Sequence, residues 1–314
     1  MSCNNATVLN RSCDTSHFRY PLFAGTYSVV LALGLPLNTV ALWTFVCRLG
    51  LTRSVPVIYM ANLAMSDLLF ILSLPLRIFY FSTGRWPLGN LACMIPGTLF
   101  SVNLYSSSLF ITFISVDRLL AVVYPLRSRP LRTVPIAWTI CTVVWLAIIA
   151  LAVPIANNHP ANWDKHCEVW RCFENYTEAE WHFGFYILCL VTFLGILVPF
   201  VIIVGCTVAV VKELRSQNAS SSSSSTAETL LKRYKMVKLF VFNLLIYAVC
   251  FIPFHVAFIL YGLHKLCFLK YNFFDFQTIT LCMASSNSCL DPLIYYFSAM
   301  SVQRQNYKVA QSSC

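Results

Sequence analysis

The segment from Gly97 to Val116 carries no charged residue, and the pair Asp117-Arg118 follows it directly. An uncharged run of this length can cross the hydrocarbon core of a bilayer as a helix. An acidic and a basic residue at its end would be costly in lipid, so they must face protein or water. The segment therefore predicts a membrane-spanning helix with a cysteine, Cys93, near one mouth and an ionic pair at the other.

Charged side chains are scarce throughout the chain. Of its 314 residues, 58% are hydrophobic and 11% are charged, and the mean hydropathy is +0.69. A soluble domain carries about 25% charged residues, so a water-soluble core does not account for this composition. Apolar windows separated by short polar joints recur along the chain, which predicts an all-α membrane protein, a seven-transmembrane helix bundle. The expected spans are residues 24–47, 55–81, 92–124, 135–156, 184–211, 234–263 and 273–299.

The distribution of Lys and Arg predicts the orientation. The segments placed inside are rich in both, and their only acidic residues are Asp117, Glu213 and Glu228. The positive-inside rule then puts the N-terminus outside a plasma membrane. The expected parts are an extracellular N-terminus (1–23), the bundle (24–299) with a third intracellular loop at about 212–233, and a cytoplasmic helix and tail (300–314). The net charge of +10 fits this topology and contact with anionic membrane lipids, and nucleic acid is not an expected partner.

Motifs for covalent modification agree with this orientation. Glycosylation sequons lie on the outer side at Asn5, Asn10 and Asn175. Cys314 is a candidate for palmitoylation, and the polar stretch 298–309 before it is expected to form a short amphipathic eighth helix at the membrane surface. Six cysteines lie outside, where oxidation is permitted, but their spacing leaves the disulfide pairing open.

Polar side chains inside the spans are the candidate functional residues. Asp67 is an acid near the middle of its span, and Asn103 and Ser107 lie four residues apart on one helical face. Together they would suit a small cation such as sodium, and an ordinary hydrogen-bonded cluster between helices fits them equally well. Arg77 follows Pro75 toward the outer mouth. It either reaches the lipid headgroups or binds an anion, and the residues alone do not decide between these.

The chain lacks the sequence motifs of metal sites, phosphate-binding loops, intramembrane enzymes and transporters. The chain has no His-Glu-x-x-His or paired Cys-x-x-Cys spacing and no glycine-rich phosphate loop, so no metal apart from sodium is expected. Ser106, Ser107 or Ser108 with His255 would be the only imaginable nucleophile and base within the membrane, and no sequence pattern supports them. Repeated halves typical of transporters are also missing. An intramembrane enzyme or a transporter therefore stays a remote alternative.

Eight short motifs occur in order along the seven spans. They are Asn38, the run Leu63–Asp67, Cys93, Asp117-Arg118, Trp145, Pro199, Cys250-Phe251-Ile252-Pro253 and Asp291-Pro292-Leu293-Ile294-Tyr295. In this register the chain resembles a rhodopsin-type (class A) G-protein-coupled receptor, from about Tyr27 to Tyr307. Each motif is weak alone, and the complete series is a strong signal.

The resemblance implies a set of structural and switch residues. It pairs Cys93 with Cys172, with Cys167 as the rival, and Cys13 with Cys267. It adds Asn287 and Asp291 to the ion pocket of Asp67, Asn103 and Ser107, because two neighbouring acids repel unless a proton or cation lies between them. It implies that span 234–263 swings about Pro253 and that Arg118 leaves Asp117 to meet a G protein, with arrestin and receptor kinases as further partners. The implied switch residues are Asp117, Arg118, Phe251, Pro253, Asp291, Pro292 and Tyr295.

One departure from the family pattern concerns the released arginine. Thr207 stands where many such receptors place a tyrosine that receives Arg118. Tyr247 or another group is then expected to take that part.

The run Ser73–Tyr80, with Arg85-Trp86-Pro87, is similar to the purinergic-like branch of these receptors, and especially to its lysophosphatidic acid receptors. Nucleotide receptors of the branch carry His-x-x-Arg or His-x-x-Lys, whereas this chain has Phe258 three residues after His255. An apolar ring there favours an acyl chain, and a nucleotide or another anionic ligand is the alternative. Arg77 is the first candidate for the phosphate, followed by Arg19 and Lys265. Candidate walls for the acyl chain, each equally explained by packing between helices, are Phe100, Tyr105, Phe254 and Phe258. His255 is a further candidate ligand-binding residue.

Overall fold

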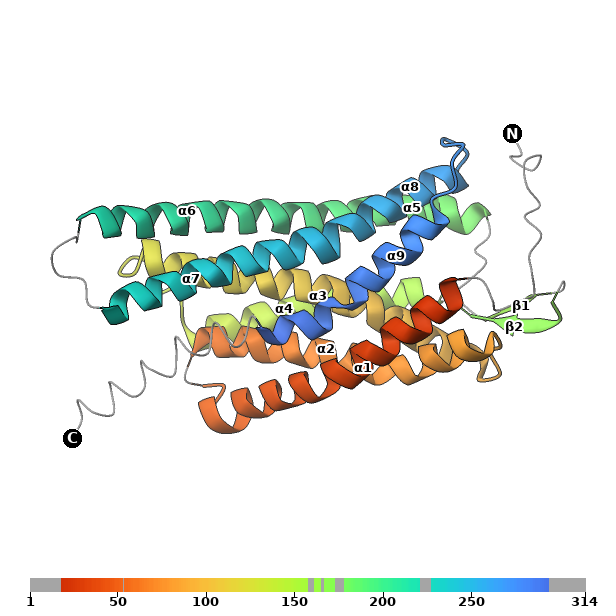
Figure 1. Cartoon of the computed structure of the whole chain (residues 1–314), viewed down its shortest axis with the longest axis horizontal. Helices are drawn as coiled ribbons and strands as arrows, with labels where there is room; N and C mark the ends of the chain where they lie inside the picture. Colours follow the sequence, from red (N-terminus) through yellow and green to blue (C-terminus); the bar gives the residue numbers. More distant parts are fainter. Residues whose placement is uncertain are drawn as a thin grey trace.

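The computed structural model describes residues 18–52, 54–157, 161–164, 167–172, 178–220 and 227–293. Long helices run side by side through most of this length (Figure 1). Six of the described helical segments are long and apolar enough to cross a membrane, and α9 with the helical residues 287–293 supplies the seventh. The helices are α1 (Arg19–Trp43), α2 (Val55–Thr83), α3 (Gly89–Val123), α4 (Val134–Asn157), α5 (Glu178–Thr192), α6 (Val198–Ser220), α7 (Ala227–Ile246), α8 (Ile252–Lys265) and α9 (Phe274–Ser285).

The helices extend beyond the predicted spans where they leave the membrane. Helix α1 begins at Arg19, five residues before the expected start, and α6 and α7 occupy most of the segment 212–233 that was expected to be a loop. A hydrogen bond of 2.9 Å from Nε2 of Gln217 to Oε1 of Glu213 spans one turn of the α6 extension. Such i,i+4 pairs stabilise a helix in water, where no bilayer boundary ends it.

Among the described residues, the π-helical turn η1 (Thr44–Leu49) ends the first span, and the turns η2 (Phe193–Leu197) and η3 (Tyr247–Phe251) each interrupt a later one. Turns η2 and η3 each lie just before a proline, Pro199 and Pro253, at the second position of the following helix. Proline lacks an N–H and crowds the carbonyl four residues earlier, so the preceding turn widens. The fifth span is therefore α5–η2–α6, and the sixth is α7–η3–α8, with its break where the sequence places Pro253.

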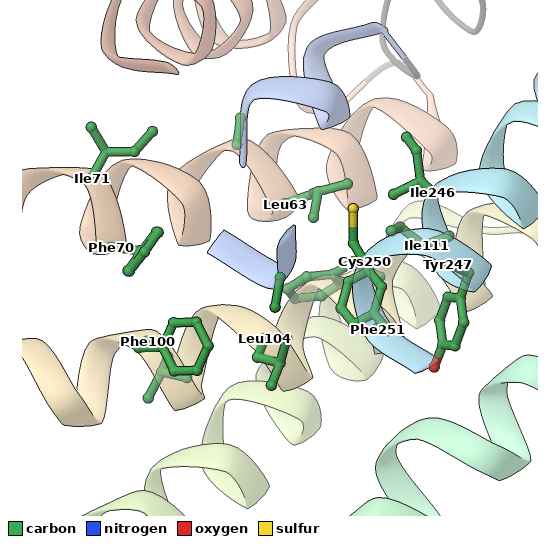
Figure 2. Close-up of a cluster of buried hydrophobic side chains, with 14 of the residues drawn as sticks. Leu63, Phe70, Ile71, Phe100, Leu104, Ile111, Ile246, Tyr247, Cys250 and Phe251 are labelled. Carbon is green, nitrogen blue, oxygen red and sulfur yellow. The ribbon is translucent and has the colours of Figure 1, made fainter. Parts of the chain in front are cut away.

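Interhelical hydrogen bonds hold the inner faces together. Nδ2 of Asn38 donates to the carbonyl of Ser288 at 2.7 Å, and Nε1 of Trp145 donates to Oδ1 of Asn62 at 2.9 Å. A polar side chain in the membrane has to find such a partner on another helix. Figure 2 shows the buried cluster between them, in which side chains from α2, α3 and η3 meet, among them Leu63, Phe70, Phe100, Leu104 and Phe251.

A two-stranded hairpin lies at the end of the bundle where α1 begins (Figure 1). Strands β1 (Asn162–Asp164) and β2 (Val169–Arg171) are antiparallel. Cys172, directly after β2, is bonded to Cys93 in α3 with 5.7 Å between the Cα atoms, which confirms the predicted pair. Because Cys93 is bonded to Cys172, the rival pairing of Cys93 with Cys167 is wrong. Cys167 and Cys267 each take part in a disulfide as well.

Candidate functional site

Arg77 lies in α2, two residues beyond Pro75, and its side chain is only 5% exposed. Its Nη1 donates to the hydroxyl of Tyr27 at 3.2 Å, and its Nη2 donates to the carbonyl of Pro96 at 3.0 Å. The guanidinium also lies 5.5 Å from the ring centroids of both Tyr27 and Phe100. Carbonyl, hydroxyl and aromatic faces are the partners that let a cation remain buried. Arg77 therefore points inward among α1, α2 and α3, not outward to the lipid headgroups.

An unbroken series of aromatic rings leads from Arg77 to Phe258. Phe100 of α3 meets Phe254 of α8 edge-on at 5.6 Å, and Phe254 stacks on Phe258 at 5.6 Å. The structure thus brings three of the predicted wall residues into one line that begins at the predicted phosphate residue. We call Arg77, Phe100, Phe254 and Phe258 the cation–aromatic line.

Tyr105 and His255 lie beside this line. The ring of His255 packs against Phe254 at 5.0 Å. Nδ1 of His255 lies 2.8 Å from the carbonyl of Phe251, and a carbonyl only accepts, so Nδ1 carries the proton. The other nitrogen, Nε2, then accepts from the hydroxyl of Tyr105 at 3.4 Å. One hydrogen bond between α3 and α8 therefore orients both predicted residues, and His255 is also held by the carbonyl of Phe251 in η3.

Arg19 and Lys265 lie at the rim of the bundle end where α1 begins (Figure 1), which we call the outer end. The Arg19 guanidinium lies between 5.0 and 5.9 Å from four ring centroids, those of Tyr20, Phe23, Phe81 and Phe274. Lys265 lies 5.4 Å from the ring of Tyr261, which in turn contacts Phe274 at 5.9 Å. The rim connects to the cation–aromatic line because Phe23 stacks on Tyr27 at 5.5 Å. Each of the three predicted cations thus lies against aromatic rings, and Arg19 and Arg77 each join two groups of rings.

Arg171 is a buried residue to which the sequence assigned no part. It is 6% exposed at the end of β2, and its Nη1 donates to the hydroxyl of Tyr20 at 2.8 Å and to the carbonyl of Gly84 at 3.1 Å. Its Nε lies 3.7 Å from a carboxylate oxygen of Asp164. These contacts fasten the hairpin to the outer ends of α1 and α2. Its place next to Cys172 is the one sequence signal that could have drawn attention to it.

The predicted ion pocket is a buried polar cluster between α2, α3 and the seventh span. Nδ2 of Asn103 donates to Oδ1 of Asp67 at 2.8 Å and lies 3.4 Å from the hydroxyls of both Ser66 and Ser107. The predicted pocket did not include Ser66 or Ser106, whose hydroxyls are hydrogen-bonded to each other. Asp67, Asn103 and Ser107 are therefore together, as predicted.

The seventh span completes this cluster. Ser288, which the predicted pocket did not include, places its hydroxyl 3.3 Å from Oδ1 of Asn103 and 3.2 Å from Oδ1 of Asn287, and its single proton can be donated to either oxygen. Asp291 is fully buried and interacts electrostatically with Asp67. Both of its carboxylate oxygens lack a hydrogen-bond partner among the described residues, as does Nδ2 of Asn287. A buried carboxyl in this condition fits a site for a small cation.

At the opposite end of the bundle, Asp117 has two basic neighbours. Arg132, which precedes α4, approaches its carboxylate with both Nε at 2.8 Å and Nη2 at 3.3 Å. Arg118 is buried and interacts electrostatically with Asp117 and Arg132. The sequence reasoning missed Arg132, which shares the carboxylate that was expected to hold Arg118.

Tyr247, suggested by the sequence as a partner for a released Arg118, is occupied elsewhere. Its hydroxyl contacts Ser108 at 2.6 Å. Ser108 precedes Arg118 by ten residues of α3, which is about 15 Å along the axis. Thr207 does not replace a tyrosine either, since its hydroxyl donates to the carbonyl of Ile203 in its own helix at 2.7 Å.

Some predicted residues lie outside the described part of the chain. The sequons Asn5, Asn10 and Asn175, the disulfide partner Cys13, the switch residue Tyr295, the expected eighth helix and Cys314 all belong to this group. Within the described ranges, no three His, Cys, Asp or Glu side chains gather as a metal site.

Comparison with known proteins places the chain in a family. The family profile described as "7 transmembrane receptor (rhodopsin family)" matches residues 37–295. The chain is 38% identical to lysophosphatidic acid receptor 6 of Homo sapiens, over 96% of this chain and 90% of that receptor. It is 38% identical to lysophosphatidic acid receptor 5 of Mus musculus, over 95% and 81%, and 33% identical to a purinoceptor of Xenopus laevis, over 89% and 52%. With its bundle of membrane-spanning helices, this chain belongs to the rhodopsin family of seven-transmembrane receptors.

Proposed function

We propose that this receptor binds a lysophospholipid, most specifically lysophosphatidic acid, and activates heterotrimeric G proteins. The observation that carries the proposal is the cation–aromatic line, which begins at the buried guanidinium of Arg77 and continues through Phe100 and Phe254 to Phe258. A lysophospholipid has one anionic end and one long apolar end, and the line offers a partner for each. The names of relatives at 35–38% identity support this ligand class.

The phosphate is assigned to Arg77, with Arg19 and Lys265 as further cations at the rim. A guanidinium has five N–H donors in a planar fork, which suits phosphate oxygens. The acyl chain is assigned to the rings of Phe100, Phe254 and Phe258, with Tyr105 and His255 beside them.

A nucleotide is the second candidate ligand, and the purinoceptor among the relatives favours it. A nucleotide with several phosphates needs a second cation close to the first. Phe258 instead stacks on another phenylalanine at 5.6 Å. This apolar contact favours a ligand with a single phosphate and a lipid tail.

The proposed response is a two-state switch. Agonist favours a state in which the sixth span swings outward about Pro253, Arg118 leaves Asp117, and a cytoplasmic cleft opens for the G protein, with Phe251, Asp291, Pro292 and Tyr295 in the same switch. Ligand energy acts only through its preference for the open state. Because such coupling is reciprocal, a bound G protein should tighten agonist binding.

Further assignments complete the proposal. A sodium ion would be held by Asp67, Asn103, Ser107, Asn287 and Asp291, where it would neutralise the paired acids. The N-terminus is placed outside the plasma membrane and glycosylated, Cys13 pairs with Cys267, and Cys314 is palmitoylated at the end of a cytoplasmic helix. Arrestin and receptor kinases are the proposed regulatory partners.

The proposal is tested by replacing Arg77. Arg77→Ala should abolish nucleotide exchange stimulated by lysophosphatidic acid in isolated membranes, while Arg77→Lys should keep a weakened response because it retains the charge without the planar fork. Cell-surface labelling of both variants checks that the receptor still reaches the membrane. Normal potency in Arg77→Ala would refute the phosphate assignment.

The second test addresses the lipid tail. Phe258→Arg places a cation where the acyl chain is assigned, so the potency of long-chain lysophosphatidic acid should fall more than that of a short-chain analogue. A panel of lysophospholipids and nucleotides in the same exchange assay measures both ligand classes. Unchanged potency for the long-chain lipid would remove the tail from this position, and turnover of lipid without G protein would favour an enzyme.

A further inference from the structure

The hairpin carries a second disulfide-bonded cysteine besides Cys172. Cys167 lies in the turn between β1 and β2, where its N–H donates to Oδ1 of Asp164 at 3.4 Å, and its sulfur is disulfide-bonded. Cys267, in the connection between α8 and α9, is disulfide-bonded as well. The partners of these two cysteines follow from the other cysteines of the chain.

Most of the 14 cysteines of the chain cannot be these partners. Cys93 and Cys172 are bonded to each other, and the described cysteines within the helical segments are free thiols. The candidates that stay are Cys3, Cys13 and Cys314, together with a bond between Cys167 and Cys267 themselves.

The hairpin and the connection between α8 and α9 lie too far apart for a bond between their cysteines. The Cα atoms of bonded cysteines lie within about 7 Å of each other. The hairpin is fastened to the connection between α2 and α3, where the N–H of Trp86 donates to the carbonyl of Trp170 at 3.0 Å. The N–H of Ala161 donates to Oδ1 of Asn90, at the start of α3, at 3.1 Å. Figure 1 shows the connection between α8 and α9 well apart from this hairpin, so each bonded cysteine has its partner elsewhere.

Cys314 belongs to the opposite face of the membrane. A receptor that crosses the membrane seven times has its two termini on opposite faces, and Cys314 follows the seventh span. The hairpin and the connection between α8 and α9 both lie at the outer end, where α1 begins (Figure 1). Two N-terminal cysteines, Cys3 and Cys13, therefore serve the two bonded cysteines of the outer end.

The reach of the chain favours one of the two possible pairings. Cys13 precedes Arg19 by six residues, and the Arg19 guanidinium lies 5.0 Å from the ring of Phe274 at the start of α9. Six residues span at most about 20 Å, which suffices for Cys267 beside that helix. This agrees with the bond between Cys13 and Cys267 proposed above. Cys3 lies ten residues further from α1, which adds up to about 35 Å of reach, and it is left for the hairpin.

We propose that Cys167 is bonded to Cys3, and that residues 3–13, tied to both outer connections, form a strap across the outer end. Formation of the bond removes two protons and two electrons from the two thiols. A protein disulfide of the oxidising secretory compartment accepts them by thiol–disulfide exchange and is reduced to two thiols. The pairing rests on the proposed orientation of the chain, but not on the identity of the ligand.

The two attachment points of the strap lie on either side of the cationic rim. Cys267 follows Lys265 by two residues. Cys167 precedes Arg171 by four residues, and Arg171 donates to the hydroxyl of Tyr20 in the first turn of α1 at 2.8 Å. A strap between these points narrows the route from water to the proposed ligand site. It should slow the binding and the release of a ligand by the same factor, because a barrier changes both rates and leaves the equilibrium unchanged.

Trypsin places the cysteines of the outer end on separate peptides, so a peptide map reads the pairing directly. Cleavage after Arg11 separates Cys3 from Cys13, and cleavage after Arg171 separates Cys167 from Cys172. Purified full-length receptor is alkylated without reduction, deglycosylated, digested and analysed by mass spectrometry. Peptide 1–11 should be linked to peptide 166–171, and peptide 12–19 to peptide 266–270. A link between 1–11 and 266–270, or an alkylated Cys167, overturns the proposal.

Two single variants test the same pairing on intact cells with a maleimide that does not cross the membrane. Cys3→Ser should create one newly labelled thiol, at Cys167. Cys13→Ser, the matched variant, should instead create one at Cys267. Labelling of Cys267 in Cys3→Ser overturns the pairing.

The placement of the strap is tested with the double variant Cys3→Ser/Cys167→Ser, which opens the bond and leaves no new thiol. Labelled lysophosphatidic acid should associate and dissociate faster than in the wild type by the same factor, whereas Cys189→Ser, which removes a free thiol, should keep wild-type rates. Wild-type rates in the double variant overturn the placement across the outer end. A wild-type receptor that binds no lysophosphatidic acid would count against the proposed function, and the peptide map would still decide the pairing.

Discussion

Buried polar groups have different surroundings at the outer end of the bundle and in its middle layer. The middle layer is the level of the bundle that contains Asp67, Asn103, Ser108, Tyr247 and Asp291. At the outer end, Arg77 and Arg171 donate to carbonyl and hydroxyl oxygens, and the Cys93–Cys172 bond fixes the loop that carries Arg171. In the middle layer, the oxygens of Asp291 lack a donor among the described residues. There the hydroxyls of Ser108 and Tyr247 lie within hydrogen-bond distance of each other and of one backbone carbonyl each, so two protons serve three contacts.

This difference suggests that the outer end is a rigid frame and that the middle layer is the part that changes conformation. A buried polar group without a partner costs about 1–3 kcal/mol, and strain of this size persists only where the surrounding structure holds it. The outer end is tied together by the hydrogen bonds of Arg77 and Arg171 and by the Cys93–Cys172 bond, so it should resist change. The middle layer stores a cost that a change of conformation, a proton or a cation can relieve.

The largest effect on stability should come from Cys172→Ser, which removes the Cys93–Cys172 disulfide at the outer end. The bond joins residues separated by 79 positions, and opening a loop of that size costs about 4–5 kcal/mol in the chain-entropy account. Little receptor should reach the cell surface, and what is purified should unfold at a lower temperature. Surface labelling and thermal unfolding measure the two effects.

Matched cysteine variants decide whether the bond itself matters. Cys93→Ser should repeat the loss, because it opens the same bond, whereas Cys189→Ser removes a free thiol and should change little. If Cys172→Ser and Cys189→Ser are equally stable, the outer end is not the rigid part of this receptor.

The sequence predicts the membrane part of the fold well, for a physical reason. Each span must offer about 20 apolar residues to the bilayer, so the windows locate the helices to within a few residues. No such limit exists in water, and the helical extension of α6 to Ser220 was therefore not predicted. The π-helical turns were also missed, although Pro253, which follows η3, was predicted as the place where the sixth span bends.

The residues of the candidate site also fall into those that the sequence could predict and those that it could not. Arg77, Asp67 and Asn103 could be picked out because a polar residue inside an apolar span is conspicuous. Arg171 could not, since a charged residue in a polar loop looks solvated until the hairpin turns it against Tyr20 and Gly84. The contact between Ser108 and Tyr247 joins residues 139 positions apart, and no local pattern encodes it.

A smaller effect, of opposite sign, is expected in the middle layer from Asp291→Asn. An amide removes the charge that faces Asp67 and brings two N–H donors, so the receptor should become more stable by about 1–2 kcal/mol. If the pocket holds sodium, exchange should also lose its dependence on sodium concentration. Thermal unfolding and exchange across a sodium series measure these results.

Asp67→Asn is the matched variant for this prediction. Asp67 already accepts from Asn103 at 2.8 Å, so its replacement should not stabilise the receptor, although sodium dependence should be lost as well. Equal stabilisation by both variants would mean that the two acids are equivalent, and the contrast between satisfied and unsatisfied groups would disappear.

The smallest effect is expected from a pair of buried asparagines. Nδ2 of Asn243 makes one long contact of 3.5 Å with Ser115, and its Oδ1 has no partner among the described residues. Asn243→Leu should therefore change stability by less than about 1 kcal/mol, toward higher stability, since the buried oxygen disappears together with a weak bond. Asn103→Leu, which removes contacts to Asp67, Ser66 and Ser107, should instead lower the unfolding temperature clearly. Equal losses of stability in the two variants would show that the unsatisfied groups of the middle layer do not destabilise the receptor. The free energy of the switch would then have to come from another part of the molecule.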